Sequence, residues 1–354
     1  MAGLAAELLD YPFDERCIAT EPAQPRDAAR LMVVRRDAGS VEHALVRDLP
    51  RWIGKGDALV VNRSSVLRAR LIAADTEGLL LEPTADGCWR MLLRRAKRYR
   101  AGERLALRSP HAGTEGDAIE LVERDAEAWK VRLVAGAAGG DASDVIERSG
   151  WTPLPPYILR ARESRHEHGD DDHDRAEYET VYADASARGS VAAPTAGLHF
   201  TEGLLAELAS RGVRRESVVL HVGAGTFKPV DAATLGEHPM HSERMFVPPA
   251  TVSMLREAPR PRVVAVGTTV VRALESLPAD AGEGGWGGET SILIAPGHAF
   301  RNVDAMLTNF HLPKSTLLAL VGAFAGLERL KELYALAQRE GYRFYSFGDA
   351  MLIV

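Results

Sequence analysis

The sequence predicts an α/β protein that also contains a small antiparallel β-barrel. Its second half alternates apolar, strand-like runs with amphipathic, helix-like runs, which is the pattern of an α/β fold. Residues 70–140 differ, because short apolar bursts there alternate with Gly, Asp and Pro, as in short strands joined by turns. The chain has 354 residues, 46% of them hydrophobic, and is therefore long enough for two domains.

The first half begins with two predicted strands. β-Branched runs at residues 31–34 and 58–61 flank the turn-like segment 54–57, which indicates buried strands on either side of it. Residues 144–149 are predicted to form a short helix that ends at Gly150. We expect the barrel strands at residues 78–81, 89–93, 104–107 and 129–134, and a linker at residues 136–140.

The second half supplies the remaining elements. We expect strands at residues 217–222, 262–266 and 291–295, and helices at residues 201–211, 269–276, 315–325 and 327–339. Between the halves, residues 162–174 are acidic and lack periodicity, so they predict a mobile surface loop. His166, His168 and His173 lie in this stretch, where a metal site is the less favoured interpretation.

Composition excludes several classes of protein. The net charge of -6 argues against a chain coated with positive charge. Cys17 and Cys88 are far apart in sequence and form no metal-binding or redox pair. The sequence shows no secretory signal and no apolar run near the ~18 residues that span a bilayer, so we expect a cytoplasmic protein without membrane contact.

Basic residues crowd one short stretch of the expected barrel. They are Arg90, Arg94, Arg95, Lys97, Arg98, Arg100, Arg104 and Arg108. Such a stretch either neutralises RNA phosphates or forms the solvated face of a sheet, and composition alone favours the solvated face.

Four runs lack helical and strand periodicity, which is typical of loops that build a site. They are residues 190–201, 220–227, 238–243 and 308–316. In the first run, Gly197 permits unusual backbone angles and His199 titrates near neutral pH. The second begins like a nucleotide-binding glycine loop, but Lys228 stands where the third glycine would be. This mismatch argues against a Rossmann-type methyltransferase, and a tight turn is the alternative.

Polar residues in the third run allow two interpretations. His238, His241 and Glu243 are residue types that bind metals. Pro239 leaves them without a helical register, so hydrogen bonding and acid–base chemistry are the favoured roles.

Two predicted helices begin with polar residues. Thr268 and Thr269 either cap their helix or bind a ligand at its positive end. Lys314 precedes Ser315 and Thr316 at the start of another helix, where a cation opposes the helix dipole. This placement favours a functional role for Lys314.

Together these runs resemble the S-adenosylmethionine:tRNA ribosyltransferase-isomerases of queuosine synthesis. The resemblance extends to residues 154–158, 180–183, 266–269 and 345–353. It implies that the barrel is inserted into a discontinuous α/β domain. The implied limits are residues 1–68 and 149–354 for the main domain and residues 69–148 for the barrel.

The resemblance also implies a reaction. The family uses S-adenosylmethionine as a ribosyl donor and co-substrate, with no recycled cofactor and no metal. The ribose is delivered to 7-aminomethyl-7-deazaguanine at the tRNA wobble position and becomes an epoxycyclopentane, while adenine and methionine leave. The sulfonium acidifies the adjacent ribose carbon, so a general base removes a proton there and a general acid assists adenine. The implied partners are S-adenosylmethionine and the anticodon arm of tRNA, and we expect a monomer.

Three sets of candidate residues follow from the motifs and the resemblance. The acid–base candidates, with the carboxylates that orient them, are His199, His221, His241, His311, Glu243 and Asp349. Substrate binding is expected of Tyr157, Tyr182, Thr195, Gly197, Gly223, Gly225, Thr226, Phe227, Thr268, Thr269, Asn309 and Lys314. RNA-backbone binding is expected of Arg94, Arg95, Lys97 and Arg98. For the aromatic candidates, stacking on a base and core packing are both open.

Two positions depart from the family pattern. Arg63 stands where the family has a carboxylate, and Glu179 where glutamine is common. An ion pair between Arg63 and Glu179 would compensate for both changes. The departures keep two alternatives open: a paralogue that acts on another RNA or base, and a catalytically silent RNA-binding protein.

Overall fold

The main sheet joins strands from both ends of the chain. The computed structural model describes residues 3–37, 39–111, 116–125, 127–223, 225 and 230–354. In this part of the chain the sheet has nine strands. In order across the sheet they are β16 (Trp286–Thr290), β14 (Glu243–Val247), β13 (Arg214–Leu220), β3 (Asp57–Asn62), β15 (Arg262–Val266), β17 (Ala305–Asn309), β18 (Ala350–Ile353), β1 (Arg30–Val34) and β2 (Val41–Leu45).

Four central strands run in the same direction. β13, β3, β15 and β17 are parallel, so their carboxyl ends lie along one edge of the sheet. β18 runs antiparallel to β17, which brings its amino end to that same edge. Because β1 and β3 precede the barrel and β13 to β18 follow it, the main domain is discontinuous, as the family resemblance implies.

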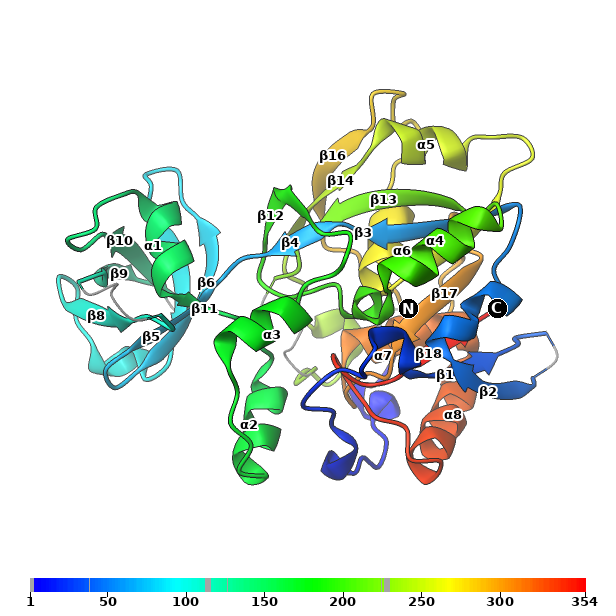
Figure 1. The fold of residues 1–354 in the computed structure, drawn as a ribbon, viewed down its shortest axis with the longest axis horizontal. Coiled ribbons are helices and arrows are strands. Elements are labelled where there is room, and N and C mark those ends of the chain that lie inside the picture. Colours follow the sequence, from blue (N-terminus) through cyan, green and yellow to red (C-terminus); the bar gives the residue numbers. More distant parts are fainter. Residues whose placement is uncertain (1–2, 38, 112–115, 126, 224, 226–229) are drawn as a thin grey trace.

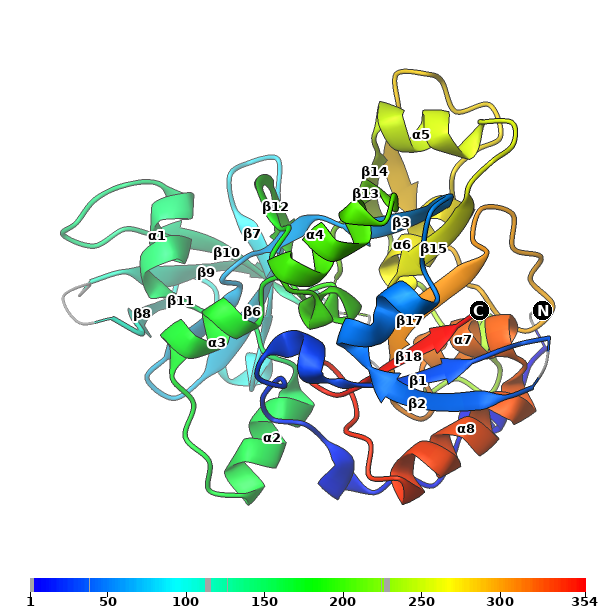
Figure 2. The ribbon, with the colours of Figure 1, turned by 45° about the vertical axis from the view of Figure 1, so that its right-hand side comes forward.

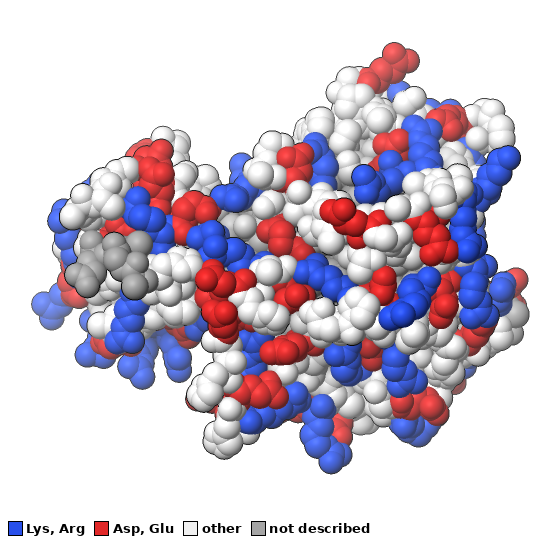
Figure 3. All heavy atoms as spheres, viewed as in Figure 1, with Lys and Arg blue, Asp and Glu red and all other residues white. Residues whose placement is uncertain are grey.

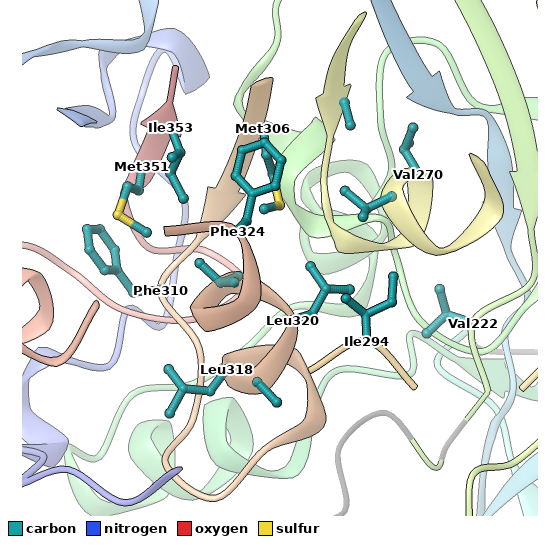
Figure 4. Packing of buried hydrophobic residues seen from close by; sticks show 14 of the residues in the cluster. Val222, Val270, Ile294, Met306, Phe310, Leu318, Leu320, Phe324, Met351 and Ile353 are labelled. Atoms are coloured by element: carbon teal, nitrogen blue, oxygen red, sulfur yellow. The ribbon is translucent and has the colours of Figure 1, made fainter. Parts of the chain in front are cut away.

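Helices cover both faces of this sheet. α6 (Thr268–Glu275), α7 (Thr316–Ala325) and α8 (Leu327–Arg339) pack on one face, and α4 (Glu202–Ser210) with the 3-10 helix η4 (Val46–Arg51) on the other. α5 (Pro249–Leu255) lies against β13. Figure 4 shows Phe324 of α7 beside Met306 of β17, and Leu320 of α7 beside Ile294. Successive strand residues point to opposite faces, so β1 contributes Met32 to one core and Leu31 to the other.

The barrel is a closed antiparallel sheet. In ring order its described strands are β5 (Arg70–Ala73), β6 (Glu77–Pro83), β7 (Trp89–Leu93), β10 (Trp129–Val134), β9 (Ala118–Arg124) and β8 (Arg104–Arg108), and pairing of β8 with β5 closes the ring. The short β11 (Gly150–Trp151) also pairs with β5, and α1 (Ala142–Ser149) precedes it. Figures 1 and 2 show the barrel beside the main domain. The predicted α/β fold with an antiparallel barrel is confirmed, whereas the domain limits stay predictions.

Residues 162–174 form the predicted loop only in part, because residues 165–170 alone lie outside helices. α2 (Pro156–Ser164) and α3 (Asp171–Glu177) enter this stretch from its two ends. Arg162 of α2 donates to both carboxylate oxygens of Asp174 in α3 at 2.7 Å, and both side chains are buried. This buried charge pair holds the two helices together. Because it involves no apolar residue, the hydropathy pattern of the sequence shows no sign of these helices.

Two other predicted elements are confirmed, and one is wrong. Residues 327–339 and 262–266 are confirmed to the residue as α8 and β15. The prediction of a strand at residues 291–295 is wrong, because the strand in this region is β16, at Trp286–Thr290. Ile294 and Ala295 are buried in the core without strand pairing, and this burial explains their apolar character. The sequence of β16, with two glycines, offers little strand signal.

A two-stranded parallel pair lies beside the main sheet. It consists of β4 (Ser64–Val66) and β12 (Asp184–Ser190). Among the described residues, no helix is both long and apolar enough to cross a membrane.

The amide of Asn62 fastens the end of β3 to β13. Its side chain is fully buried, donates to the Leu220 carbonyl at 2.9 Å and accepts from the Leu220 and Ser64 amides at 3.0 and 3.1 Å. Asn62→Ala would leave these backbone groups without partners, so we expect the free energy of unfolding to fall by about 3 kcal/mol in urea titrations.

Ser64→Ala is the matched control for that experiment. Ser64 is equally buried, but its hydroxyl has no hydrogen-bond partner among the described residues. Its removal should therefore leave the free energy of unfolding unchanged or slightly raised. Equal losses in the two variants would contradict the role assigned to Asn62.

Candidate functional site

A pocket of about 70 Å³ lies at the carboxyl edge of the parallel strands. Its walls come from the residues after β15, the residues after β17, the segment before β18 and the 3-10 helix η6 (Thr195–His199). The carboxyl edge of an open α/β sheet is the usual place for a ligand. We call this the edge pocket. Its polar lining residues are Tyr157, Thr195, Thr268, Thr269, Thr308, Asn309, His311, Ser315, Tyr345 and Ser346.

Asn309 holds three walls of the edge pocket together. It ends β17 and is buried. Its amide nitrogen donates to the carbonyls of Tyr345 and Ser346 at 3.0 and 3.4 Å, and its oxygen accepts from the Thr195 hydroxyl at 3.0 Å. The pocket therefore depends on an amide that can donate and accept at once.

His311 is the histidine that lines the edge pocket. Burial lowers its pKa to about 4, so the imidazole is neutral at pH 7. Its Nε2 lies 2.8 Å from the Thr308 hydroxyl, and its backbone binds the side chains of Tyr11 and Tyr334. The ring is thus fixed in place with one nitrogen engaged by a neighbour.

Unsatisfied hydroxyl groups surround the same pocket. The hydroxyls of Thr269 and Tyr345 are buried and have no hydrogen-bond partner within the described part of the chain. Tyr157 in turn hydrogen-bonds Ser346 at 2.6 Å, and burial raises the pKa of Tyr157 to about 12. Buried polar groups normally have partners, so a polar ligand would complete this lining.

The first turn of α6 opens onto the edge pocket. Its N-cap is Gly267, with φ 90°, and no side chain caps the helix. The alternative that Thr268 or Thr269 serves only as the cap is therefore wrong. Free amides at the positive end of a helix favour an anionic group.

A larger cleft of about 370 Å³ lies between the barrel and the main domain. Glu82, Arg90 and Glu127 line it from the barrel, and His221, His241, Glu243, Arg244 and Glu289 from the main domain. Val222 lines both this cleft and the edge pocket, so the two hollows adjoin. The cleft is rich in charge, whereas no Asp, Glu, Lys or Arg is among the residues that line the edge pocket.

A buried ion pair shapes the wall of this cleft. Glu243 of β14 contacts Arg272 of α6, and both side chains are almost fully buried. The same carboxylate accepts from the Gly223 amide at 3.1 Å. A side chain at Gly225 would meet the His241 ring at 2.3 Å, so glycine is needed there.

His221 also lines the cleft. Its Nδ1 is buried without a hydrogen-bond partner in the described residues. Burial, together with nearby Arg244, lowers its pKa. His221 is therefore a neutral, half-buried imidazole beside a charged cleft.

Two acid–base candidates lie away from both hollows. The ring nitrogens of His199 lie 3.1 and 2.9 Å from the carbonyls of Ala196 and Gly348, and burial lowers its pKa. Asp349 accepts from the amides of Arg30 and Arg343 at 3.0 and 2.8 Å. Both side chains are occupied in holding backbone segments together.

Several binding candidates also lie elsewhere. Tyr182 belongs to the core beneath η6, where Gly197 leaves room for its hydroxyl. Lys314 forms an ion pair with Asp10 at 3.2 Å instead of lining the edge pocket. Thr226 and Phe227 lie outside the described residues.

The predicted RNA-binding residues are exposed on the barrel. Arg94 and Arg98 pair with Glu77 and Asp75 at 3.4 and 2.9 Å, and Arg95 and Lys97 lie beside them. Figure 3 shows basic side chains along the lower edge of the barrel. None of the four lines the edge pocket or the cleft.

Arg63 and Glu179 do not pair with each other. Arg63 contacts Asp184, whereas Glu179 accepts from the Val66 amide at 3.3 Å. The prediction of a compensating ion pair between Arg63 and Glu179 is therefore wrong, since each residue has another partner.

Some site residues had no individual sequence signal. Tyr345 and Ser346 belong to a motif that the resemblance includes, but their place in the pocket comes from pairing of β18 beside β17. Arg272 lies in the middle of a helix, and only its burial identifies it. The described residues contain no group of three or more His, Cys, Asp or Glu arranged to hold a metal ion.

Comparisons with known proteins agree on one family. A family model described as "Queuosine biosynthesis protein" matches residues 6–353. Proteins named S-adenosylmethionine:tRNA ribosyltransferase-isomerase from Rubrobacter xylanophilus and Acidiphilium cryptum are 46% and 45% identical, covering 98% and 97% of this chain and 96% and 97% of their own lengths.

A solved structure gives the same result. The S-adenosylmethionine tRNA ribosyltransferase of Thermotoga maritima is 34% identical, with a TM-score of 0.55, and the match covers 98% of this chain and 100% of that one. The chain therefore belongs to the queuosine biosynthesis family of S-adenosylmethionine:tRNA ribosyltransferase-isomerases.

Proposed function

We propose that the chain transfers the ribosyl group of S-adenosylmethionine to 7-aminomethyl-7-deazaguanine at the wobble position of tRNA and isomerises it to an epoxycyclopentane. Adenine and methionine are the released products, and S-adenosylmethionine is a co-substrate rather than a recycled cofactor. The observation that carries the proposal is the edge pocket, where unsatisfied hydroxyls and a neutral histidine adjoin a cleft that opens toward the barrel.

S-adenosylmethionine extends across both hollows. The edge pocket alone holds about 70 Å³, whereas sites for molecules of this size usually measure roughly 300–1,000 Å³. The adjoining cleft supplies the missing space. Thr268 and Thr269 with the amides of α6 suit an anionic or polar part of the ligand, and Tyr157 offers an aromatic face.

His311 is the first choice for moving the proton in the edge pocket. As a neutral imidazole it accepts a proton from the ribose carbon beside the sulfonium. Burial disfavours the protonated ring, so the proton passes on readily to the departing adenine. His221, His241 and Glu243 in the cleft are left to contact the amine of the tRNA base.

The barrel holds the RNA in this proposal. Arg94, Arg95, Lys97 and Arg98 neutralise phosphates of the anticodon arm, and the main domain recognises the base. A monomer and a cytoplasmic location stay predictions.

Product analysis tests the proposed reaction. Protein incubated with S-adenosylmethionine and tRNA bearing 7-aminomethyl-7-deazaguanine is expected to release adenine and methionine in equal amounts, with an epoxycyclopentane-bearing nucleoside detected by mass spectrometry. S-adenosylhomocysteine would instead identify methyl transfer. RNA binding without either product, beside an active family member as control, would contradict catalysis and favour the silent RNA-binding alternative.

His311→Gln is expected to lower kcat for adenine release by about 10²–10⁴-fold, because the variant lacks the imidazole that accepts and passes on the proton. The ratio of wild-type to variant kcat/KM should stay constant as the pH falls through 6.5 and should decline only toward pH 4, where His311 takes up a proton in the free protein.

His43→Gln is the matched control, since His43 hydrogen-bonds Tyr342 away from both hollows. It should keep the wild-type kcat. A His311→Gln variant with an equally unchanged kcat would contradict the assignment.

Asn309→Asp should lower kcat/KM by about 10²-fold, because a carboxylate cannot donate to the carbonyls of Tyr345 and Ser346 and the pocket wall shifts. Asn302→Asp loses a similar donor, which bonds the Leu274 carbonyl at 2.6 Å outside the pocket. It is expected to reduce thermal stability while keeping kcat/KM. The same kcat/KM in both variants would argue against a special role for Asn309.

A further inference from the structure

A small pocket of about 60 Å³ lies where the barrel joins the main domain. Both connections between the two units border it: residues 66–68 lead from β4 to β5, and residues 152–153 follow β11. Its remaining walls come from α1, from the end of α3 with the two residues that follow it, and from β12. We call it the junction pocket.

Three arginines line the junction pocket, namely Arg68, Arg175 and Arg188. Glu147 at the end of α1 lies 3.3 Å from Arg68 and contacts Arg188 more closely. Glu179 is the second acidic lining residue, and burial raises its pKa, which disfavours its charged form. Arg175 is already paired with Asp171 and Asp172, at 3.4 and 3.7 Å. Arg68 and Arg188, by contrast, share the single carboxylate of Glu147. The positive excess in the pocket therefore lies on Arg68 and Arg188.

Two further polar groups of this lining are unsatisfied. The Thr152 hydroxyl and the Nε of Arg175 are buried and have no hydrogen-bond partner among the residues that the structure describes. Both are able to donate a hydrogen bond. An anion with several acceptor oxygens would satisfy them together with the arginines.

We propose that the junction pocket binds a phosphate group of the RNA backbone. The inference rests on the tRNA substrate of the proposed function. A phosphodiester carries two anionic oxygens that match the fork of a guanidinium, as a carboxylate does. Glu147 thus holds Arg68 and Arg188 in the free protein, and the RNA phosphate takes its place.

The position of the pocket suits such a contact. Arg188 is exposed and reaches solvent, while Tyr178 forms part of the inner wall. The Tyr178 ring packs edge-on against Phe347, at 5.8 Å between ring centres, and Phe347 follows Ser346 of the edge pocket. Figure 3 shows basic side chains among acidic ones along this junction. The rings of Tyr178 and Phe347 would thus lie between a phosphate held here and Ser346 of the edge pocket.

Opposite effects of two substitutions test the proposal. Affinity for tRNA is measured by fluorescence anisotropy at several salt concentrations. Arg188→Gln should weaken binding about tenfold and reduce the slope of log Kd against log salt by about one, since one phosphate contact is lost. Glu147→Gln should tighten binding about threefold, because it frees the arginines for the phosphate. Arg188→Lys, which keeps the charge, should recover part of the affinity.

Arg211→Gln is the matched control, because Arg211 is similarly exposed and pairs with Glu207 on the surface of α4. It should bind tRNA as the wild type does. If the Glu147–Arg188 contact serves only to join the domains, Glu147→Gln and Arg188→Gln will weaken binding alike, and the proposal is overturned. Unchanged affinity in both variants overturns it as well.

The source of the phosphate is tested separately. Inorganic phosphate that raises the melting temperature of the wild type but not of Arg188→Gln, with no difference in their tRNA affinity, would assign the pocket to a free anion and overturn the RNA assignment. A wild type that binds no tRNA would refute the proposed function itself, whereas tRNA binding insensitive to Arg188 and Glu147 refutes this inference alone.

Discussion

The buried amide of Asn309 is the contact on which the edge pocket depends. Thr195, Asn309 and the pair Tyr345 and Ser346 are far apart in sequence, and a single side chain holds them at the end of β17. Apolar packing at this place could bring the segments together without fixing their positions relative to one another. Hydrogen bonds with one hydroxyl donor and two carbonyl acceptors do fix these positions, because the carbonyls accept only from the amide nitrogen and the amide oxygen is left to accept from the hydroxyl.

Charge is divided between the two adjoining hollows. The edge pocket is lined by hydroxyls, an amide and the neutral His311, whereas carboxylates and arginines line the cleft. This division suits a reaction in which a cationic sulfonium loses its neighbouring proton, since a buried neutral base does not hold the proton it takes up. The charged cleft, by contrast, suits a polar substrate that arrives from solvent with its RNA.

The sequence predicted elements best where one physical signal decided them. α8 has a clear amphipathic repeat and β15 a β-branched run, and both were found to the residue. The sequence did not reveal that His199 contacts two backbone carbonyls, because a histidine beside glycine looks the same whether it meets substrate or the main chain. The contacts of Asp349 were not readable from the sequence either, since only the tertiary fold brings the backbone amides of Arg30 and Arg343 to its carboxylate.

The two departures from the family pattern lie away from the pocket proposed for S-adenosylmethionine. Asp184 neutralises Arg63 at the start of β12, and neither Arg63 nor Glu179 is among the residues that line the edge pocket or the cleft. The reversed charge at position 63 is therefore met by a local carboxylate and does not oppose a cationic ligand in the edge pocket. Glu179 faces the junction pocket instead, where its own charge is disfavoured by burial. These two departures thus lie outside the pocket proposed for S-adenosylmethionine and outside the cleft that adjoins it.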